Sequence, residues 1–311
     1  MEPPYVGCYS GSKVMCIRST RGALLALVCL AVIFPFSTSL AAPKRSKAAE
    51  KSGIIAKDPY LGAIIVEAKS GRVLFEDHAD RRGYPASVLK LMDLLIILEK
   101  VERHELSLRD QVPVSANATR VPESRVELQE DETFPVDELL YALMVRSAND
   151  AAIALAEKVG GSVDGFLELM NRRAKELGMT STVFHTVNGL PPGAGQQHDI
   201  TTARDLSILS REVLKHKDTL RYTSTRERVF RPNAGKRTVQ MTTHNHLLGK
   251  VQGCDGLKTG FTNASGFSIA VTAARNGQRV IVIVLDSATT KARDAKAREL
   301  VEKGFEMLRR G

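Results

Sequence analysis

The hydrophobic pattern of the chain is strongest between positions 91 and 98, where Asp93 is the only polar residue. Leucine, methionine and isoleucine fill this run, and together they predict a mostly buried helix over 87–104. Pro85 stands just before it, at a position that a helix start tolerates. Two β-rich runs at 61–67 and 72–76 predict a hairpin that precedes this helix.

Polar and periodic segments alternate through the middle of the chain. Residues 110–135 are polar and contain prolines, which is typical of loops or extended structure. Apolar residues then recur at helical spacing, and Ser162 can cap one helix that ends at Gly178. The predicted helices are 136–144, 151–159, 162–178 and 203–214, with a loop rich in glycine and proline at 181–200.

The pattern changes to strands after residue 226. The predicted strands are 227–230, 238–242, 256–262, 266–274 and 279–285, and an amphipathic helix at 291–308 follows them. Arg275-Asn276-Gly277 predicts a hairpin turn between the last two strands. Two strands, a block of helices, then strands and a helix indicate an α+β fold, with one antiparallel sheet split in sequence around a helical insertion.

The first forty residues have the pattern of an export signal. Lys13, Arg18 and Arg21 precede an apolar stretch at 23–33, and Ser39-Leu40-Ala41 places small residues where a signal peptidase cuts. The stretch is short for a membrane span, which needs about 20 residues. We expect a signal peptide at 1–41, a linker at 42–57 and one catalytic domain at 58–311. An uncleaved signal anchor is the alternative.

Composition and charge narrow the classes of function. The chain has 311 residues, 43% of them hydrophobic and 25% charged, and a formal net charge of +9. A basic exported protein suits polyanionic surroundings or a cell-envelope polymer, and export argues against nucleic acid. His244 and His246 lie two positions apart without an evident third ligand, so we interpret them as structural and expect no metal site.

Ser87 and Lys90 are the first candidates for catalysis. Residues three apart share a helix face, so the amine of Lys90 can reach the hydroxyl of Ser87. Burial at the start of an apolar helix can lower the pKa of the lysine and make it a base. The Ser-x-x-Lys pattern alone is weak, and Ser10-Gly11-Ser12-Lys13 is a second copy in the signal segment.

Two further motifs follow in a fixed order. Ser147-Ala148-Asn149 stands at a junction between predicted helices, and Lys258-Thr259-Gly260 lies within a predicted strand. Each has a decoy, Ser115-Ala116-Asn117 and Lys51-Ser52-Gly53, so order and context carry the argument. Ser-x-x-Lys, Ser-x-Asn and Lys-Thr-Gly together form the signature of penicillin-binding proteins and β-lactamases.

More specifically, the chain resembles the serine-type D-alanyl-D-alanine carboxypeptidases, the low-molecular-mass penicillin-binding proteins, from about residue 58 onward. The resemblance implies the β-lactamase/penicillin-binding-protein transpeptidase-like fold, an antiparallel sheet flanked by helices. The motifs that carry it are Pro85-Ala86-Ser87 through Met92, Leu177-Gly178-Met179, Asn188-Gly189-Leu190-Pro191, Thr202-Ala203-Arg204-Asp205-Leu206 and the long segment 255–267.

The resemblance also implies catalytic roles. Ser87 would attack the carbonyl of the penultimate D-alanine and become acylated, and Lys90 would take its proton, although the acylation base is disputed across these enzymes. Ser147 would relay a proton to the leaving amine, with Lys258 keeping that region electropositive. Asn149 would hold Lys90 and the substrate amide.

The predicted substrate-binding residues lie on and near the Lys-Thr-Gly strand. Lys258 and Thr259 of the Lys258-Thr259-Gly260 motif would bind the terminal carboxylate, and the N–H groups of Ser87 and Phe261 would form the oxyanion hole. Arg293 matches an arginine that the family uses near that carboxylate, with a surface arginine as the alternative.

The chain departs from the family pattern in a few places. Leu89 and Asp93 stand where threonine is common, and Asp93 changes the local charge. Many family members continue into a second β domain and an amphipathic anchor, and the chain ends before both, so we expect no membrane attachment through the C-terminus.

The expected partners are peptidoglycan stem peptides, with β-lactams as covalent inhibitors and no cofactor. An endopeptidase that cuts peptide cross-links would use the same residues and remains an alternative. A class A β-lactamase is less favoured, because Glu168-Leu169-Met170-Asn171 has the wrong spacing for its deacylating glutamate. A non-catalytic peptidoglycan-binding module is disfavoured by the complete set of motifs.

Overall fold

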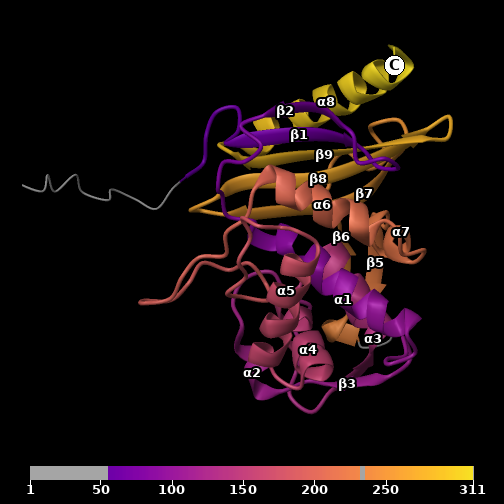
Figure 1. Cartoon of the computed structure of the whole chain (residues 1–311). Helices are drawn as coiled ribbons and strands as arrows, with labels where there is room; N and C mark the ends of the chain where they lie inside the picture. The colour runs from indigo at the N-terminus through magenta and orange to yellow at the C-terminus, as the bar shows by residue number, and fades with distance from the viewer. Residues whose placement is uncertain (1–54, 232–234, 311) are drawn as a thin grey trace, which may run out of the picture. The chain divides into compact units, whose positions relative to one another are not determined.

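The most apolar strand of the sequence, β9, lies at the centre of a five-stranded antiparallel sheet with the order β2-β1-β9-β8-β7 (Figure 1). The computed structural model describes residues 55–231 and 235–310. The strands of this sheet are β1 (Gly62–Glu67), β2 (Val73–Asp77), β7 (Cys254–Thr262), β8 (Gly266–Arg275) and β9 (Gln278–Ser287). The prediction of one sheet split around a helical block is confirmed.

Both faces of the sheet are buried. Along β9, Val282 packs in a cluster with α8 (Thr290–Arg310), whereas the next residue, Ile283, belongs to the larger cluster formed with the other helices. Successive side chains of a strand point to opposite faces, so a strand covered on both sides has a continuous apolar sequence. Figure 1 shows α8 on one face of the sheet and α6 (Ala203–Val213) on the other.

The helical block stands between β2 and β7 in sequence. Besides α6 it contains α1 (Lys90–Glu102), α2 (Ala116–Arg120), α3 (Val136–Tyr141), α4 (Asn149–Gly160), α5 (Val163–Glu176) and α7 (Thr219–Thr223). Two small antiparallel pairs accompany it, β3 (Gln111–Pro113) with β4 (Thr133–Pro135) and β5 (Glu227–Phe230) with β6 (Val239–Thr242). Helix α1 is buried over residues 90–98, as its apolar run predicts.

Local signals in the sequence fix several boundaries. Ser162 caps α5 by accepting a hydrogen bond from the Gly165 N–H at 2.9 Å, and Thr202 caps α6 in the same way. Asn276 and Gly277 both have positive φ, 49° and 75°, in the turn between β8 and β9. This left-handed pair is what a two-residue hairpin turn of matching twist requires.

Several segments differ from the predictions. The helix expected over 87–104 begins as a 3₁₀ turn at Ala86–Leu89, and its α-helical part is Lys90–Glu102. The helix expected over 136–144 is α-helical only to Tyr141 and continues as a π turn at Ala142–Arg146. Residues 110–135, predicted as loops or extended structure, contain the short strands β3 and β4, but also the helix α2, which was not predicted. The short helix α7 was not predicted either. Contacts between distant segments decide these details, and they override local pattern.

The predicted signal segment, 1–41, and residues 42–54 of the predicted linker lie outside the described residues. At the end of that linker, the Ile55 N–H donates to the Ala264 carbonyl at 2.8 Å, and the Lys57 N–H donates to the Asp286 carbonyl at 2.9 Å. Residues 55–57 therefore already contact the folded unit. In the described part of the chain, no helix combines the length and the apolar character that crossing a membrane requires.

Candidate active site

Ser87 and Lys90 lie where the 3₁₀ turn meets α1. The Nζ atom of Lys90 is 2.9 Å from Ser87 Oγ, so the predicted contact between positions i and i+3 is present. Ser87 lies in the first helical turn, ahead of the first hydrogen bond of that turn, which the Val88 N–H donates to the Pro85 carbonyl at 3.0 Å. The hydroxyl, the amine and a free N–H are thus close together.

Lys90 is fully buried and has polar partners on three sides. Besides Ser87, its Nζ donates to Asn149 Oδ1 at 2.7 Å and to the Asn188 carbonyl at 2.9 Å, and Ser147 Oγ lies 3.5 Å away. Burial lowers the pKa of Lys90 to about 7, against the opposing effect of Asp93 and other acids. A substantial fraction of this amine is therefore neutral near pH 7, as a general base requires.

Ser147 connects the two buried lysines. It follows the π turn Ala142–Arg146 and adopts a left-handed conformation, with φ 62°. This conformation is uncommon for residues other than glycine, and it is frequent at functional sites. Lys258 Nζ donates to Ser147 Oγ at 3.0 Å. The polar contacts therefore run from Ser87 through Lys90 and Ser147 to Lys258. Ser147 thus lies between a hydrogen-bond donor of β7 and the amine of α1.

Lys258 is buried on β7. Its Nζ donates to Ser147 Oγ and, at 2.9 Å, to the Thr259 carbonyl. Desolvation first, and repulsion from Lys90 and Arg293 next, hold the pKa of Lys258 well below its usual range. The structure therefore brings Ser87, Lys90, Ser147, Asn149 and Lys258 into one hydrogen-bonded group.

The strand β7 passes directly against the 3₁₀ turn. A Cβ atom built on Gly260 would lie 2.7 Å from the Pro85 carbonyl and 3.1 Å from the Ser87 backbone nitrogen. Only glycine allows this approach, which brings the following residue of β7 to the mouth of the site. Phe261 is 48% exposed and stacks on Phe267 with 4.3 Å between ring centroids.

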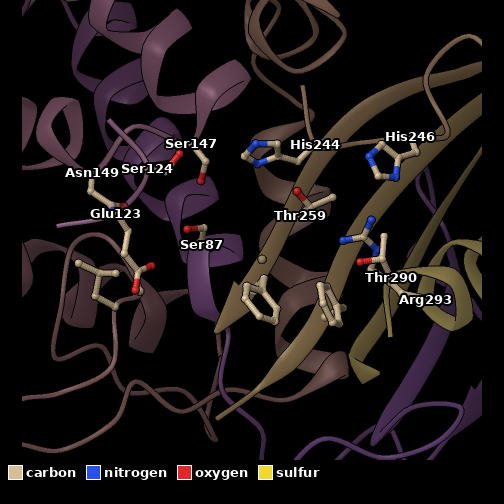
Figure 2. A pocket seen from close by; sticks show the side chains of 15 residues that line it. Ser87, Glu123, Ser124, Ser147, Asn149, His244, His246, Thr259, Thr290 and Arg293 are labelled. Atoms are coloured by element: carbon tan, nitrogen blue, oxygen red, sulfur yellow. The ribbon is translucent and has the colours of Figure 1, made fainter. Parts of the chain in front are cut away.

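A pocket of about 310 Å³ opens above this group. Seven of the predicted site residues line it: Ser87, Ser147, Asn149, Thr259, Gly260, Phe261 and Arg293. Figure 2 shows Ser87 between a wall that carries Glu123 and a wall that carries Thr259 and Arg293. Arg293 is only 3% exposed. The alternative of a surface arginine is therefore wrong.

One functional contact of the site comes from the long loop 181–200. The Asn188 carbonyl accepts from Lys90 Nζ and from Ser87 Oγ, the latter at 3.3 Å. Gly189 has φ 79°, and a Cβ on it would clash with the Ala86 carbonyl. The motif Asn188-Gly189-Leu190-Pro191 was the available signal, but its contact through a backbone carbonyl cannot be derived from side-chain chemistry.

Five other pocket residues were not predicted from the sequence: Glu123, Ser124, His244, His246 and Thr290. The first two lie in a stretch predicted as loops or extended structure. The histidines follow β6 in a loop, and neither spacing nor periodicity indicated the pocket. The pocket lowers the pKa of His244 to about 4, by desolvation first and the charge of Lys258 next. In residues 55–231 and 235–310, no group of three or more His, Cys, Asp and Glu side chains could hold a metal ion.

Glu168 lies within α5 (Val163–Glu176) and is absent from the pocket lining among the described residues. A split antiparallel sheet, with a half-buried serine and a fully buried lysine beside the helical block, defines the transpeptidase-like class of penicillin-binding proteins. Penicillin-binding protein D2 of Listeria monocytogenes in its ampicillin-bound form has this fold, with a TM-score of 0.71 and 34% identity over 79% of this chain and 98% of that one.

Sequence comparison gives the family. The family model for D-alanyl-D-alanine carboxypeptidase matches residues 47–289, and the chain belongs to this family. It is 31% identical to the D-alanyl-D-alanine carboxypeptidase DacF of Bacillus subtilis over 78% of this chain and 61% of that protein. It is also 31% identical to the D-alanyl-D-alanine endopeptidase of Escherichia coli, over 82% of both proteins. The chain spans about 60% of the length of the carboxypeptidase relatives.

Proposed function

We propose that this protein is a serine-type D-alanyl-D-alanine carboxypeptidase that acts on peptidoglycan stem peptides through an acyl-enzyme. The observation that carries the proposal is the contact of Lys90 Nζ with Ser87 Oγ at 2.9 Å inside a buried polar group. A surface serine and lysine would not need the three further hydrogen-bond partners that surround them.

The hydrogen bonds of Lys90 explain how Ser87 can be acylated. A neutral amine has two N–H donors, which Asn149 Oδ1 and the Asn188 carbonyl can accept, and one lone pair, which then faces the Ser87 hydroxyl. Lys90 takes the proton of Ser87 while Oγ bonds to the carbonyl carbon of the penultimate D-alanine. The N–H groups of Ser87 and Phe261 stabilise the oxyanion.

Collapse of the tetrahedral intermediate breaks the peptide bond and releases the terminal D-alanine. Its amine receives a proton from Ser147, which regains one through Lys258 or Lys90, the two amines beside it. Water then hydrolyses the ester of Ser87 and restores the free enzyme. Lys258, Thr259 and Arg293 form the cationic and hydroxyl wall that would bind the substrate carboxylate.

β-Lactams are the proposed covalent inhibitors, because their ring amide acylates a serine held in this way. The ampicillin-bound structure of Penicillin-binding protein D2 supports this for a protein of similar fold. We also propose export to the periplasm or cell-wall space. Its support is the signal-like pattern at 1–41, and sequencing of the mature N-terminus should then read Ala42 or close to it.

An endopeptidase that cleaves cross-links is the second candidate. It is favoured by one observation: the match to the endopeptidase of Escherichia coli covers 82% of that protein, whereas the match to DacF covers 61%. The two activities share every step above and differ in the amine that leaves.

Two measurements test these proposals. Penicillin should acylate the parent protein and the Ser115→Ala variant, whose serine belongs to the decoy motif and caps α2. It should not acylate Ser87→Ala, as read by intact mass. Covalent label on Ser87→Ala would refute the assignment. Digestion of purified muropeptides then separates the two candidates, since a carboxypeptidase releases D-alanine and an endopeptidase converts cross-linked dimers to monomers.

A further inference from the structure

Glu123 places a carboxylate on the wall of the candidate pocket. Among the described residues that line it, Glu123 is the only acid, and Arg293, His244 and His246 are the basic side chains. Figure 2 shows the Glu123 carboxylate on the wall opposite Thr259 and Arg293, with Ser87 between the two walls. Burial lowers the pKa of His244 to about 4, so its ring is neutral near pH 7, and Arg293 forms an ion pair with Asp294 at 2.7 Å. The pocket thus has the Glu123 carboxylate at one end and the Arg293 guanidinium at the other, with the reactive hydroxyl in the middle.

The backbone of Glu123 is fixed on both sides by Asn149. Asn149 Nδ2 donates to the Pro122 carbonyl at 3.1 Å, and the Asn149 N–H donates to the Ser124 carbonyl at 2.7 Å. Between these two bonds Glu123 adopts φ 65°, a conformation that costs a non-glycine residue about 1 kcal/mol or more. The surrounding hydrogen bonds therefore hold an unfavourable conformation that keeps this side chain at the pocket.

The carboxylate of Glu123 has no ion-pair partner within residues 55–231 and 235–310. Its neighbour Glu127 differs in this respect, although it lies in the same loop and also has a positive φ. Glu127 forms an ion pair with Arg125 at 2.8 Å and does not line the pocket. One of two similar acids is thus neutralised locally, while the other faces the space above Ser87.

We propose that Glu123 selects acyl donors that carry a positive charge on the acyl side of the bond to be broken. This inference rests on the proposed function, because the terminal carboxylate of the substrate occupies the Lys258 and Arg293 wall. The acyl part then extends past Ser87 toward Glu123. In a stem peptide the cation is the side-chain amine of a diamino acid that precedes the two D-alanines, and in a penicillin it is an amine on the acyl side chain.

Three penicillins that differ at one carbon test the selection. At this carbon ampicillin carries an ammonium group, benzylpenicillin a hydrogen and carbenicillin a carboxylate. The assay is run at a slightly acidic pH, which keeps the amine of ampicillin protonated. The readout is the second-order acylation rate constant of each, divided by that of benzylpenicillin. The charge of Glu123 also raises the pKa of Lys90, so its loss changes the fraction of neutral amine. That effect multiplies all three rate constants by the same factor and therefore cancels in the ratios.

Glu123→Gln should lower the ampicillin ratio about two- to fivefold and raise the carbenicillin ratio by a similar factor, as expected for an exposed charge pair. Both changes should shrink at high salt. Glu127→Gln, the matched control, should leave both ratios unchanged. Lysyl-D-alanyl-D-alanine with a free side-chain amine should likewise lose rate relative to the same peptide acetylated on that amine, in Glu123→Gln only.

Three results would overturn the selection. Ratios that stay constant in Glu123→Gln would show that Glu123 acts on Lys90 or on the loop and not on the ligand. Normal ratios with slower release of the penicilloyl group would make Glu123 a hydrolytic base instead. Failure of all three penicillins to acylate the parent protein would refute the proposed function, and the selection with it, and is distinguishable from both.

Discussion

The backbone carbonyl of Asn188 accepts a hydrogen bond from Lys90 Nζ at 2.9 Å, across 98 positions of sequence. The loop that carries Asn188 is itself held by Asp199. Its Oδ1 accepts from the His185 and Thr186 N–H groups, and its Oδ2 accepts from the Thr186 hydroxyl at 2.6 Å. Thr186 Oγ accepts in turn from the Gly189 N–H at 2.8 Å. Asp199 and Thr186 therefore fix the carbonyl that positions the lysine.

Thr186→Val should slow acylation by penicillin about tenfold without direct contact to the ligand. The change keeps the shape of the side chain but removes both hydroxyl hydrogen bonds, so the Asn188 carbonyl is less well positioned. The lost bonds should also lower the free energy of unfolding by about 1–3 kcal/mol. Stopped-flow acylation and urea denaturation measure the two effects.

Thr225→Val is the matched control, because its exposed hydroxyl bonds only to the Arg221 carbonyl. If acylation by Thr186→Val falls no further than by Thr225→Val, the loop does not position Lys90.

The acylation rate should rise with pH and level off above about pH 7. Burial lowers the pKa of Lys90 to about 7, and only the neutral amine can take the proton of Ser87. A pH profile with benzylpenicillin, which has no group that titrates in this range on its acyl side chain, measures the midpoint. Lys90→Ala should lose about 100- to 10,000-fold in rate, the range that general base catalysis provides. A profile that is flat between mildly acidic and neutral pH would exclude Lys90 as the base.

The sheet and most helices could be predicted because their signals are local. The continuous apolar run of β9, the serine and threonine caps of α5 and α6, and the Asn276-Gly277 turn each depend on neighbouring residues. Ser87 and Lys90 were predictable for the same reason, since one helical turn relates them.

The other half of the site depends on contacts between distant segments. Lys258 Nζ donates to Ser147 Oγ although 111 positions separate the two residues. Gly260 packs against the Ser87 backbone because β7 forms the edge of the sheet beside α1. Motif resemblance supplied these residues, but no periodicity relates them. Neither periodicity nor a motif indicated Glu123. Its position depends on hydrogen bonds from Asn149 to a segment that the sequence predicts as loops or extended structure.

Asp93 should make the protein less stable as pH rises. It is fully buried one turn after Lys90, and within the described chain neither of its carboxylate oxygens has a hydrogen-bond partner. Desolvation, partly offset by Lys90, raises its pKa well above 3.8. Above pH 3.8 the unfolded chain releases this proton while the folded protein keeps it, so the folded state binds more protons and its stability falls with pH.

Asp93→Asn removes that proton uptake. The free energy of unfolding of the variant, relative to the parent, should therefore increase from about pH 5 to about pH 8. Urea denaturation at both pH values measures the difference in free energy of unfolding between the two proteins. The other buried acids titrate in both proteins, so their contributions cancel in this difference. Parallel pH dependence in the two proteins would mean that Asp93 is ionised in the folded state.

Gly260→Ala should lower acylation by penicillin at least tenfold, because one methyl group would displace β7 from the turn that carries Ser87. The new Cβ would lie 2.7 Å from the Pro85 carbonyl and 3.1 Å from the Ser87 nitrogen, and both neighbours are backbone atoms that cannot rotate away. Separation of the two segments would move the Phe261 N–H away from the oxyanion, and removing one such donor typically costs about 100- to 1,000-fold in rate. Gly193→Ala is the matched control, because a Cβ there meets only the flexible side chain of Gln196. Acylation rates of Gly260→Ala equal to those of Gly193→Ala would show that the close approach of β7 to Ser87 has no part in the chemistry.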